Sequence, residues 1–548
     1  MSSREKYRLS RNWYAATISI GLIVALPVLA VLCSWFYGTG EHWEHLSEHL
    51  IYELVWHSII LVVGVCFCSA ALGTGLAWMV TMYDFPFRNF LRWALIAPLA
   101  MPAYNLGFIY SGMLDYSGPL RTSIRESFGS DWFMPEVRGY MGVVLVMTLS
   151  LYPYIYLIAQ GAFATQGRRL MEAGRILGKK PTEVFWKLAL PGARAFILGA
   201  MVLVAMETLA DFGTVSVFVF DTFTTAIYKS WYGFYSPETA GQLASLLILM
   251  VFGLIWYQQS IENKRNYGAV GSVVQRPTLI AFRQRYRSWL ITALLLTVVL
   301  IGSVIPVSQL ILWSSEIWQT EIDRRIWELV AHSVTLGIGA SLIVCLGSVV
   351  ITMAIRTFPN KKLVFFGRIA TLGYALPGSV LAIGLYLPLV WVDHRLSDLL
   401  ESLFSMDQVD LLITGSGAAM MIGLAIRFMA VGHASIQNHG RRIQVSIDEA
   451  SSTFGVTGLK MIKRVHAPIL SKGIITAAIL VFVDVLKEMP LTLMTRPFGW
   501  DTLSVRIYEM TSEGEWEKAA LPALFLFFTG LIPVFLLIGA AKQEAKNV

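Results

Sequence analysis

Long apolar stretches separated by shorter polar ones recur along the whole chain. About twelve of these stretches reach the roughly 20 mostly apolar residues that a helix needs to cross the hydrocarbon core of a membrane. Six fall in each half of the chain, at 13–37, 53–81, 91–113, 139–161, 193–218, 239–259, 288–313, 330–356, 364–392, 411–434, 472–495 and 519–541. The pattern predicts an all-α polytopic membrane protein.

Composition agrees with a lipid environment. The 548 residues are 55% hydrophobic and only 14% charged, whereas soluble chains carry about 25% charged residues. Lysine and arginine outnumber aspartate and glutamate, 43 to 36. In a membrane protein this surplus is typical of cytoplasmic loops, so we expect a lipid bilayer and no nucleic acid as partner.

The sign of the charge alternates from loop to loop. The loops after the fourth and tenth stretches and the connector at 260–287 are rich in lysine and arginine, whereas the loops after the first and ninth stretches are acidic. Basic loops stay on the cytoplasmic side of a membrane. The alternation therefore predicts that both termini are cytoplasmic.

The two halves of the chain repeat each other. His57-Ser58 recurs 275 residues later as His332-Ser333, and Glu172-Ala173 recurs 277 residues later as Glu449-Ala450. Each half has an even number of apolar stretches, so both enter the membrane from the same side. We therefore expect two pseudo-symmetric halves of about six membrane helices, related by an axis along the membrane normal. The predicted boundaries are 1–259 for the first half, 260–287 for a linker and 288–548 for the second half.

Two basic loops carry the same landmarks at the same spacing. In each, a Glu-Ala pair is followed by a glycine six residues after the glutamate and a proline nineteen residues after it: Glu172, Ala173, Gly178 and Pro191, then Glu449, Ala450, Gly455 and Pro468. Glycine can adopt the positive φ that separates two helices, and proline suits the first turn of a helix. The spacing predicts a helix, a glycine turn and a helix start in both loops.

These loops resemble the EAA loop of ABC importer permeases. Gly174 and Ser451 replace the third small residue of that pattern, and Val465 and Ala467 depart from it before the proline of the second loop. The resemblance implies that each loop docks onto one copy of an ATP-binding cassette ATPase and transmits its motion to the membrane helices. The alternative is an ordinary amphipathic surface loop. The occurrence of two copies with the same spacing argues against this alternative.

The chain has no ATP-binding motif of its own. Gly174-x3-Gly178-Lys179-Lys180 has one residue too few between its glycines for a phosphate-binding loop and lacks the following serine or threonine. No nucleophile–base pair or metal-ligand cluster stands out either. We therefore expect a transport subunit and not an enzyme, with no cofactor or firmly assigned metal site, and with ATP and Mg on two separate ATPase copies.

Acidic residues interrupt the apolar stretch that follows each EAA-like loop. Glu207 and Asp211 are four residues apart, as are Asp484 and Glu488, which predicts one helix face for each pair. A carboxylate near the bilayer centre costs about 2.5–3.5 kcal/mol on insertion scales. These four carboxylates are candidates for a substrate path. The alternatives are positions in water at the outer helix ends or structural pairs.

A further pair of matching segments extends the repeat. Residues 224–228, Thr-Thr-Ala-Ile-Tyr, align with 503–508, Leu-Ser-Val-Arg-Ile-Tyr. With the acidic helices and the EAA-like loops, they resemble the fused iron(III) importer permeases that work with a periplasmic ferric-binding protein. The resemblance implies the bacterial inner membrane, a periplasmic substrate-binding protein, an ATPase pair and iron(III) as cargo. A fused permease for another substrate such as thiamine, or a stand-alone secondary transporter, remains an alternative.

Overall fold

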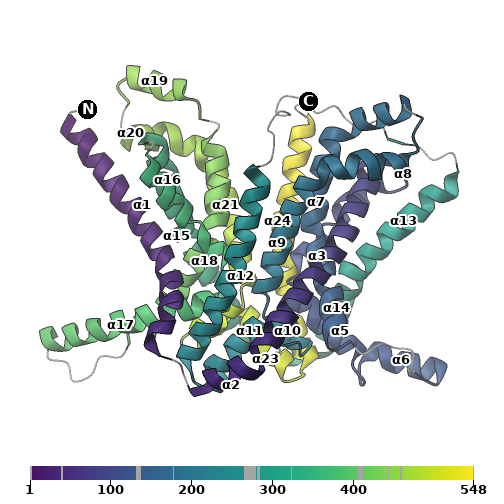
Figure 1. Cartoon of the computed structure of the whole chain (residues 1–548), viewed down its shortest axis with the longest axis horizontal. Helices are drawn as coiled ribbons and strands as arrows, with labels where there is room; N and C mark the ends of the chain where they lie inside the picture. Colours follow the sequence, from purple (N-terminus) through teal and green to yellow (C-terminus); the bar gives the residue numbers. More distant parts are fainter. Residues whose placement is uncertain are drawn as a thin grey trace. The chain divides into compact units, whose positions relative to one another are not determined.

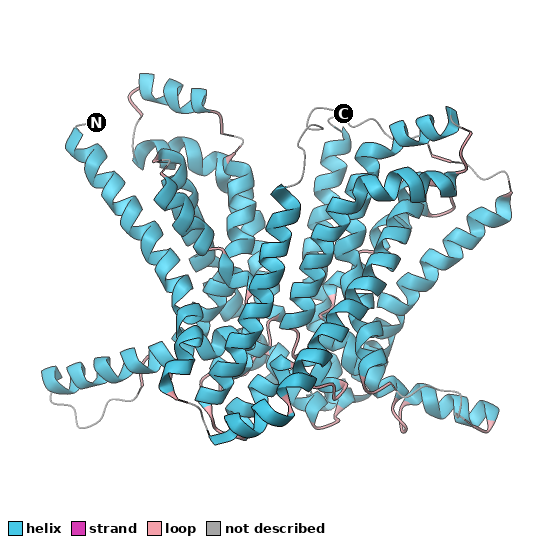
Figure 2. Ribbon diagram, viewed as in Figure 1, coloured by secondary structure: helices cyan, strands magenta, loops and turns pink. Residues whose placement is uncertain are grey.

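The computed structural model describes residues 3–38, 41–130, 137–176, 178–263, 279–280, 284–321, 324–358, 360–404, 411–441, 443–456 and 459–546. Helices make up these residues almost entirely (Figure 2), and within them the only strand-like pairing is one isolated bridge between Tyr83 and Ile280. Most of the predicted linker lies outside the described residues. The expectation of an all-α membrane protein is confirmed.

Ten helices of the described part are long and apolar enough to cross a membrane, or eleven if one sharply bent pair counts as a span. The ten are Asn12–Phe36, Ile51–Met82, Tyr140–Thr165, Pro181–Ala210, Pro237–Ser260, Arg285–Gln319, Arg324–Thr357, Gly378–Leu403, Gly417–Gly440 and Lys463–Lys487. The twelfth predicted stretch, 519–541, lies in a further helix, α24 (Trp516–Lys546), which is not among the ten.

Several of the predicted stretches are broken rather than continuous, and two of them break beside prolines at equivalent places in the repeat. The stretch 91–113 bends by 89° between Arg88–Ala100 and Ala103–Phe128. The stretch 364–392 divides into α16 (Lys361–Ile369), a short 3-10 turn and α17 (Gly378–Phe404). The reason is proline at equivalent places, Pro102 and Pro377, because proline lacks the N–H that would continue the preceding helix and restricts the residue before it.

The chain forms two compact units, and neither coincides with a sequence half. The first comprises residues 1–46, 226–248 and 320–508, and the second comprises 47–225, 249–319 and 509–548. The predicted domains 1–259 and 288–548 stay a prediction about the repeat, because the compact units are divided at other residues. Each compact unit takes segments from both sides of the predicted linker.

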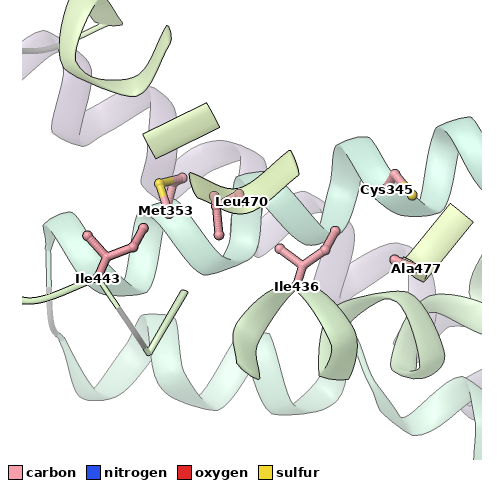
Figure 3. Packing of buried hydrophobic residues seen from close by; sticks show 6 residues of the cluster. All are labelled: Cys345, Met353, Ile436, Ile443, Leu470 and Ala477. Carbon is pink, nitrogen blue, oxygen red and sulfur yellow. The ribbon is translucent and has the colours of Figure 1, made fainter. Parts of the chain in front are cut away.

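The core of the first unit is a bundle of α15 (Arg324–Thr357), α18 (Gly417–Gly440) and α21 (Ala467–Lys487). Figure 3 shows its buried cluster: Cys345, Met353, Ile436, Ile443, Leu470 and Ala477. Gly432 lets α18 approach α15 closely, because a Cβ there would lie 2.4 Å from Val344 Cγ1. Small residues at such crossings favour helix association in lipid, where close packing replaces the hydrophobic effect.

Helix α1 (Ser3–Leu32) also belongs to the first unit, although it is distant in sequence. It packs along α15, α16 and α17 (Figure 1). At one crossing a Cβ added to Gly384 would lie 2.4 Å from the carbonyl oxygen of Pro27. The contact thus requires glycine on α17, which makes the docking of α1 specific.

The second unit is built around α3 (Ile51–Met82), α7 (Tyr140–Ile176) and α9 (Leu190–Ala210). A Cβ on Gly73 of α3 would lie 2.8 Å from the carbonyl oxygen of Tyr152 on α7. Segments from the second half complete the unit: α13 (Arg285–Val299) packs on α4 (Arg88–Ala94), and α24 packs on α5 (Ala103–Leu114). This unit also exchanges helices across the repeat.

Candidate functional site

Both EAA-like loops adopt the predicted backbone path. In the first, α7 ends at Ile176, Gly178 has a φ of +65°, and the short α8 (Pro181–Val184) leads through a π-helical turn into α9. In the second, α19 (Val445–Thr453) precedes Gly455 with a φ of +71°, and a π-helical turn leads into α21. The predicted glycine turns are confirmed.

The remaining landmarks fall where the spacing places them. Pro191 and Pro468 occupy the first turns of α9 and α21. Glu449 and Ala450 are exposed on α19, whereas Glu172 and Ala173 lie on α7 at positions whose side chains are outside the described set. The second loop therefore presents its glutamate to the surroundings.

The second loop is held by a charged cluster that the sequence did not reveal. Arg356, near the end of α15, donates to the carbonyl oxygen of Ile443 at 2.9 Å and to a carboxylate oxygen of Asp448 at 2.6 Å. The other carboxylate oxygen of Asp448 lies 2.8 Å from Nε2 of the buried His466. Asp448 precedes Glu449 directly, so the cluster fixes the position of α19.

The first loop is held differently. Gly174 on α7 packs against Val184 of α8, where an added Cβ would lie only 2.3 Å from Val184 Cγ2. Glu183 forms exposed ion pairs with Lys179 at 3.4 Å and with Lys187 at 3.5 Å. The counterparts of Asp448 and His466 at the repeat offset are Met171 and Ala189, so the charged cluster has no equivalent there.

Asp211 caps a short helix. The helix α9 ends at Ala210, one residue before Asp211. The prediction that Glu207 and Asp211 share one face of a continuous helix is therefore wrong. The Asp211 carboxylate accepts hydrogen bonds from the backbone N–H groups of Thr214 and Val215, at 2.8 and 3.2 Å, and from the Thr214 hydroxyl at 2.9 Å. It satisfies the first turn of α10 (Gly213–Val217).

Glu488 does the same in the second half. The helix α21 ends at Lys487, and the Glu488 carboxylate accepts from the N–H groups of Leu491 and Thr492, both at 3.0 Å, in the first turn of α22 (Pro490–Thr495). Glu488 is 5% exposed, and Nε of Arg427 lies 3.7 Å from its Oε1. Asp211 and Glu488 thus each accept hydrogen bonds from the start of a short helix, an arrangement that was not among the alternatives drawn from the sequence.

Glu207 and Asp484 lie one turn earlier, on α9 and α21, and both are partly buried. Among the described residues, no group of three or more His, Cys, Asp or Glu side chains is arranged to hold a metal ion. A role of the four carboxylates on a substrate path stays a prediction.

A repeated histidine clamp went unrecognised in the sequence, although its signal was the recurring His-Ser pair. Nδ1 of His57 lies 3.0 Å from the carbonyl oxygen of Asp221, and Nδ1 of His332 lies 3.1 Å from that of Asp501. The rings also pack on Phe220 and Trp500, with centroids 4.6 and 4.5 Å apart. Each clamp ties the start of a long helix to the loop that follows the capped short helix.

Known proteins share this sequence pattern. Residues 69–260 match the family described as binding-protein-dependent transport system inner membrane component. The Fe(3+)-transport system permease protein FbpB 2 of Haemophilus influenzae is 26% identical over 95% of this chain and 96% of its own length. The ferric transport system permease protein FbpB of Actinobacillus pleuropneumoniae is 22% identical over 94% of this chain and 77% of its own.

A shorter relative matches part of the chain. The sulfate transport system permease protein CysW of Escherichia coli is 25% identical over 38% of this chain and 70% of its own length. The family match covers residues 69–260, and the two ferric permease relatives align with nearly the whole of this helical membrane chain, so the chain is similar to the membrane components of binding-protein-dependent transport systems.

Proposed function

We propose that this permease moves iron(III) from a periplasmic substrate-binding protein into the cytoplasm, driven by a separate ATPase present in two copies. The observation that carries the proposal is the match to a Fe(3+)-transport permease over 95% of this chain and 96% of that relative. ATP and Mg belong on the ATPase, and this chain supplies the membrane path.

The two EAA-like loops are the proposed contacts with the ATPase copies. Each combines a helix, a glycine turn and a second helix that leads directly into a membrane helix, α9 or α21. A displacement of the second helix is therefore passed to the membrane helix through the continuous helical turns at 181–210 and 459–487. The exposed Glu449, and Glu172 by repetition, are the proposed anchors.

The cap residues connect this motion to the proposed path. Asp211 and Glu488 join the ends of α9 and α21 to the short helices α10 and α22 through the hydrogen bonds described above. Movement of α9 therefore displaces α10 through Asp211, and movement of α21 displaces α22 through Glu488. Glu207 and Asp484, one turn away, are the proposed groups that meet the cation, since iron(III) prefers oxygen ligands.

The decisive experiment compares uptake of labelled iron(III), thiamine and sulfate in cells that lack the native transporter and express the complete system. We expect uptake of iron(III) alone, and its loss when the ATPase subunit is omitted. Uptake of thiamine or sulfate instead of iron would overturn the cargo. Iron uptake that persists without the ATPase would show a secondary transporter.

A further inference from the structure

Two amphipathic arms extend sideways from the long helices, one in each compact unit. The first arm is α6 (Pro119–Phe128), and the second is the last part of α17, residues 391–403. In Figure 1, α6 leaves at the end of α24 opposite the C-terminus, and α17 leaves at the end of α1 opposite the N-terminus. Each arm therefore starts where the long helices of its own unit end.

Both arms carry an apolar stripe that their own unit leaves uncovered. The structure describes α6 completely, and none of its ten residues is buried. Leu120, Ile124 and Phe128 follow one another at intervals of four residues on one helix face, and Phe128 is 75% exposed. In the second arm, Leu399 and Leu403 are also four residues apart and are 53% and 65% exposed.

The same apolar positions occur in both arms. An offset of 275 residues, which also relates Pro102 to Pro377, pairs apolar or aromatic residues at three places in or beside the arms: Tyr116 with Trp391, Ile124 with Leu399, and Phe128 with Leu403. Single exposed apolar residues are common on protein surfaces. Their recurrence at matched positions of the repeat indicates a surface that lies against apolar material.

An arginine lies over an exposed aromatic ring at the base of each arm. The guanidinium carbon of Arg125 is 4.2 Å from the ring centroid of Tyr116, and that of Arg395 is 5.7 Å from the ring centroid of Trp391. Tyrosine and tryptophan collect at the boundary between acyl chains and headgroups, and arginine beside them extends its charge to the polar side. This combination favours a lipid surface as the material that the stripes contact.

The charges of the arms are sorted with respect to the stripes. On α6, Arg121 and Arg125 border the stripe, whereas Glu126 lies on the opposite side of the helix. On the second arm, Arg395 borders the stripe, and Glu401 lies on the opposite side. The bordering charges are therefore the cationic ones, which suit the phosphate groups of lipids.

A buried carboxylate fixes the second arm at its base. Asp393 accepts hydrogen bonds from the backbone N–H groups of Ile413 and Thr414, at 2.8 and 2.7 Å, in the segment that leads into α18. The arm is thus tied both to the helix that it continues and to the chain that returns from it. Its stripe has a defined direction relative to the first unit.

We propose that both arms lie in the headgroup layer of a phospholipid bilayer, with their apolar stripes against the acyl chains and their arginines at the phosphates, and that they hold each unit at a fixed depth. A helix with an apolar stripe, bordering cations and a polar opposite side binds in the plane of a membrane interface. The proposal concerns the arms alone and does not depend on the cargo.

Spin labels measure the contact with lipid directly. In a cysteine-free chain in phospholipid nanodiscs, nitroxides are attached to Phe128→Cys or Leu403→Cys on the stripes. Glu126→Cys and Glu401→Cys, exposed on the opposite sides, are the matched controls. We expect oxygen, which concentrates among acyl chains, to relax the stripe labels, and a water-soluble nickel chelate to relax only the controls. Equal access of the chelate to stripe and control labels would overturn the proposal.

The same labels decide between lipid and a protein partner. If the stripes instead bind a periplasmic substrate-binding protein, their labels will be open to the nickel chelate in nanodiscs and will lose this access only when that protein is added. This outcome would refute contact with lipid. Protection in nanodiscs that is unchanged by the added protein is the result that we expect.

A charge placed on a stripe tests whether an arm holds its unit at a fixed depth. A nitroxide at Tyr52→Cys, exposed near the start of α3 in the second unit, reports the depth of that helix. We expect Phe128→Asp to shift the depth of this label, because the charge leaves the apolar layer. Ser123→Asp adds the same charge on an exposed polar position of α6 and will leave the depth unchanged. An unshifted label in Phe128→Asp would show that the arm does not set the depth.

Discussion

At the residue scale, the two cap residues differ in length, because Glu488 has one methylene group more than Asp211. The Glu488 carboxylate lies beneath the start of α17, where a Cβ added to Gly378 would be 2.5 Å from Oε1. The counterpart of Gly378 at the repeat offset of 275 is Ala103, at the start of α5, and the counterpart of Glu488 at the offset of 277 is the shorter Asp211. Glutamate is thus paired with glycine, and aspartate with alanine.

This complementarity predicts that Gly378→Ala destabilises the permease. The added methyl group must push Glu488 away from the first turn of α22, and overpacking of this kind costs about 1–3 kcal/mol. Thermal unfolding in detergent will show a lower midpoint, and Glu488→Asp in the same chain will restore part of the loss. Gly417→Ala is the control, since Gly417 also begins a helix but has open space around its Cβ position. Equal effects at both glycines would contradict the pairing.

Substitution of Asp211 distinguishes between two functions of its carboxylate, capping of α10 and contact with the cargo. Asparagine caps a helix about as well as aspartate, whereas alanine costs about 0.5–2 kcal/mol at such a position. If Asp211 acts only as a cap, Asp211→Asn will keep both the unfolding temperature and the uptake rate, and Asp211→Ala will lower the temperature. A stable Asp211→Asn variant with little uptake would instead place this carboxylate in contact with the cargo.

The residue pattern alone predicted the matched carboxylates but not their partners. Spacing of four residues implies a shared helix face only if the helix continues. The helix α9 stops at Ala210 and α21 stops at Lys487, so the second carboxylate of each pair turns to the following short helix. Gly213 and Pro490, just after these ends, were the local signals of a break.

At the element scale, the helix α19 depends on the Arg356–Asp448–His466 cluster. Arg356→Ala removes a hydrogen bond between charged groups that are both less than a third exposed, worth about 1.5–3 kcal/mol. We expect normal membrane insertion, weaker association with the ATPase and less uptake per ATP hydrolysed. Lys187→Ala in the first loop is the control, because Glu183 keeps its pair with Lys179. Full coupling in Arg356→Ala would show that the cluster does not position α19.

The elements themselves were largely predictable, and their breaks were not. Apolar stretches gave the positions of most long helices because lipid leaves few alternatives to a hydrogen-bonded helix. Residues on both sides of Pro102 and Pro377 are equally apolar, so hydropathy cannot distinguish a kinked span from two short helices. The prolines marked where a bend was allowed, while its 89° angle depends on neighbouring helices.

At the scale of the whole molecule, the loop charges make a prediction about orientation. In a cysteine-free permease, an impermeant thiol reagent added to intact cells will label Ser127→Cys and Asp398→Cys, which are exposed at the predicted outer face. Lys180→Cys and Ser452→Cys, exposed in the EAA-like loops, will react only after the membrane is opened. Labelling of Lys180→Cys in intact cells would reverse the orientation.

The exchange of helices between the two halves could not be predicted from the sequence. A repeat reveals duplication, but equal offsets are compatible with packing inside each half or across halves. Contacts such as Gly384 with Pro27 decide between these, and they depend on three-dimensional fit at residues whose sequence context is unremarkable.

Expression of the chain in two pieces tests the exchange. Residues 1–263 alone leave α1 without α15, α16 and α17, and residues 279–548 alone leave these helices without α1. We expect each piece to be degraded when expressed by itself, and both to accumulate and co-purify when expressed together. Two stable separate pieces would show that each half folds independently.

The exchange of helices between the two halves also delays the packing of α1 during biosynthesis. The helix α1 ends at Leu32, but its first partner, α15, begins only at Arg324. At roughly 5–20 residues per second, the ribosome reaches that partner roughly 15–60 s after α1 has emerged. Throughout this interval the docking face of α1, including Pro27, is in the bilayer without its partner helices. A nascent chain of this design therefore depends on lipid or an insertion chaperone to keep its first helix from pairing wrongly.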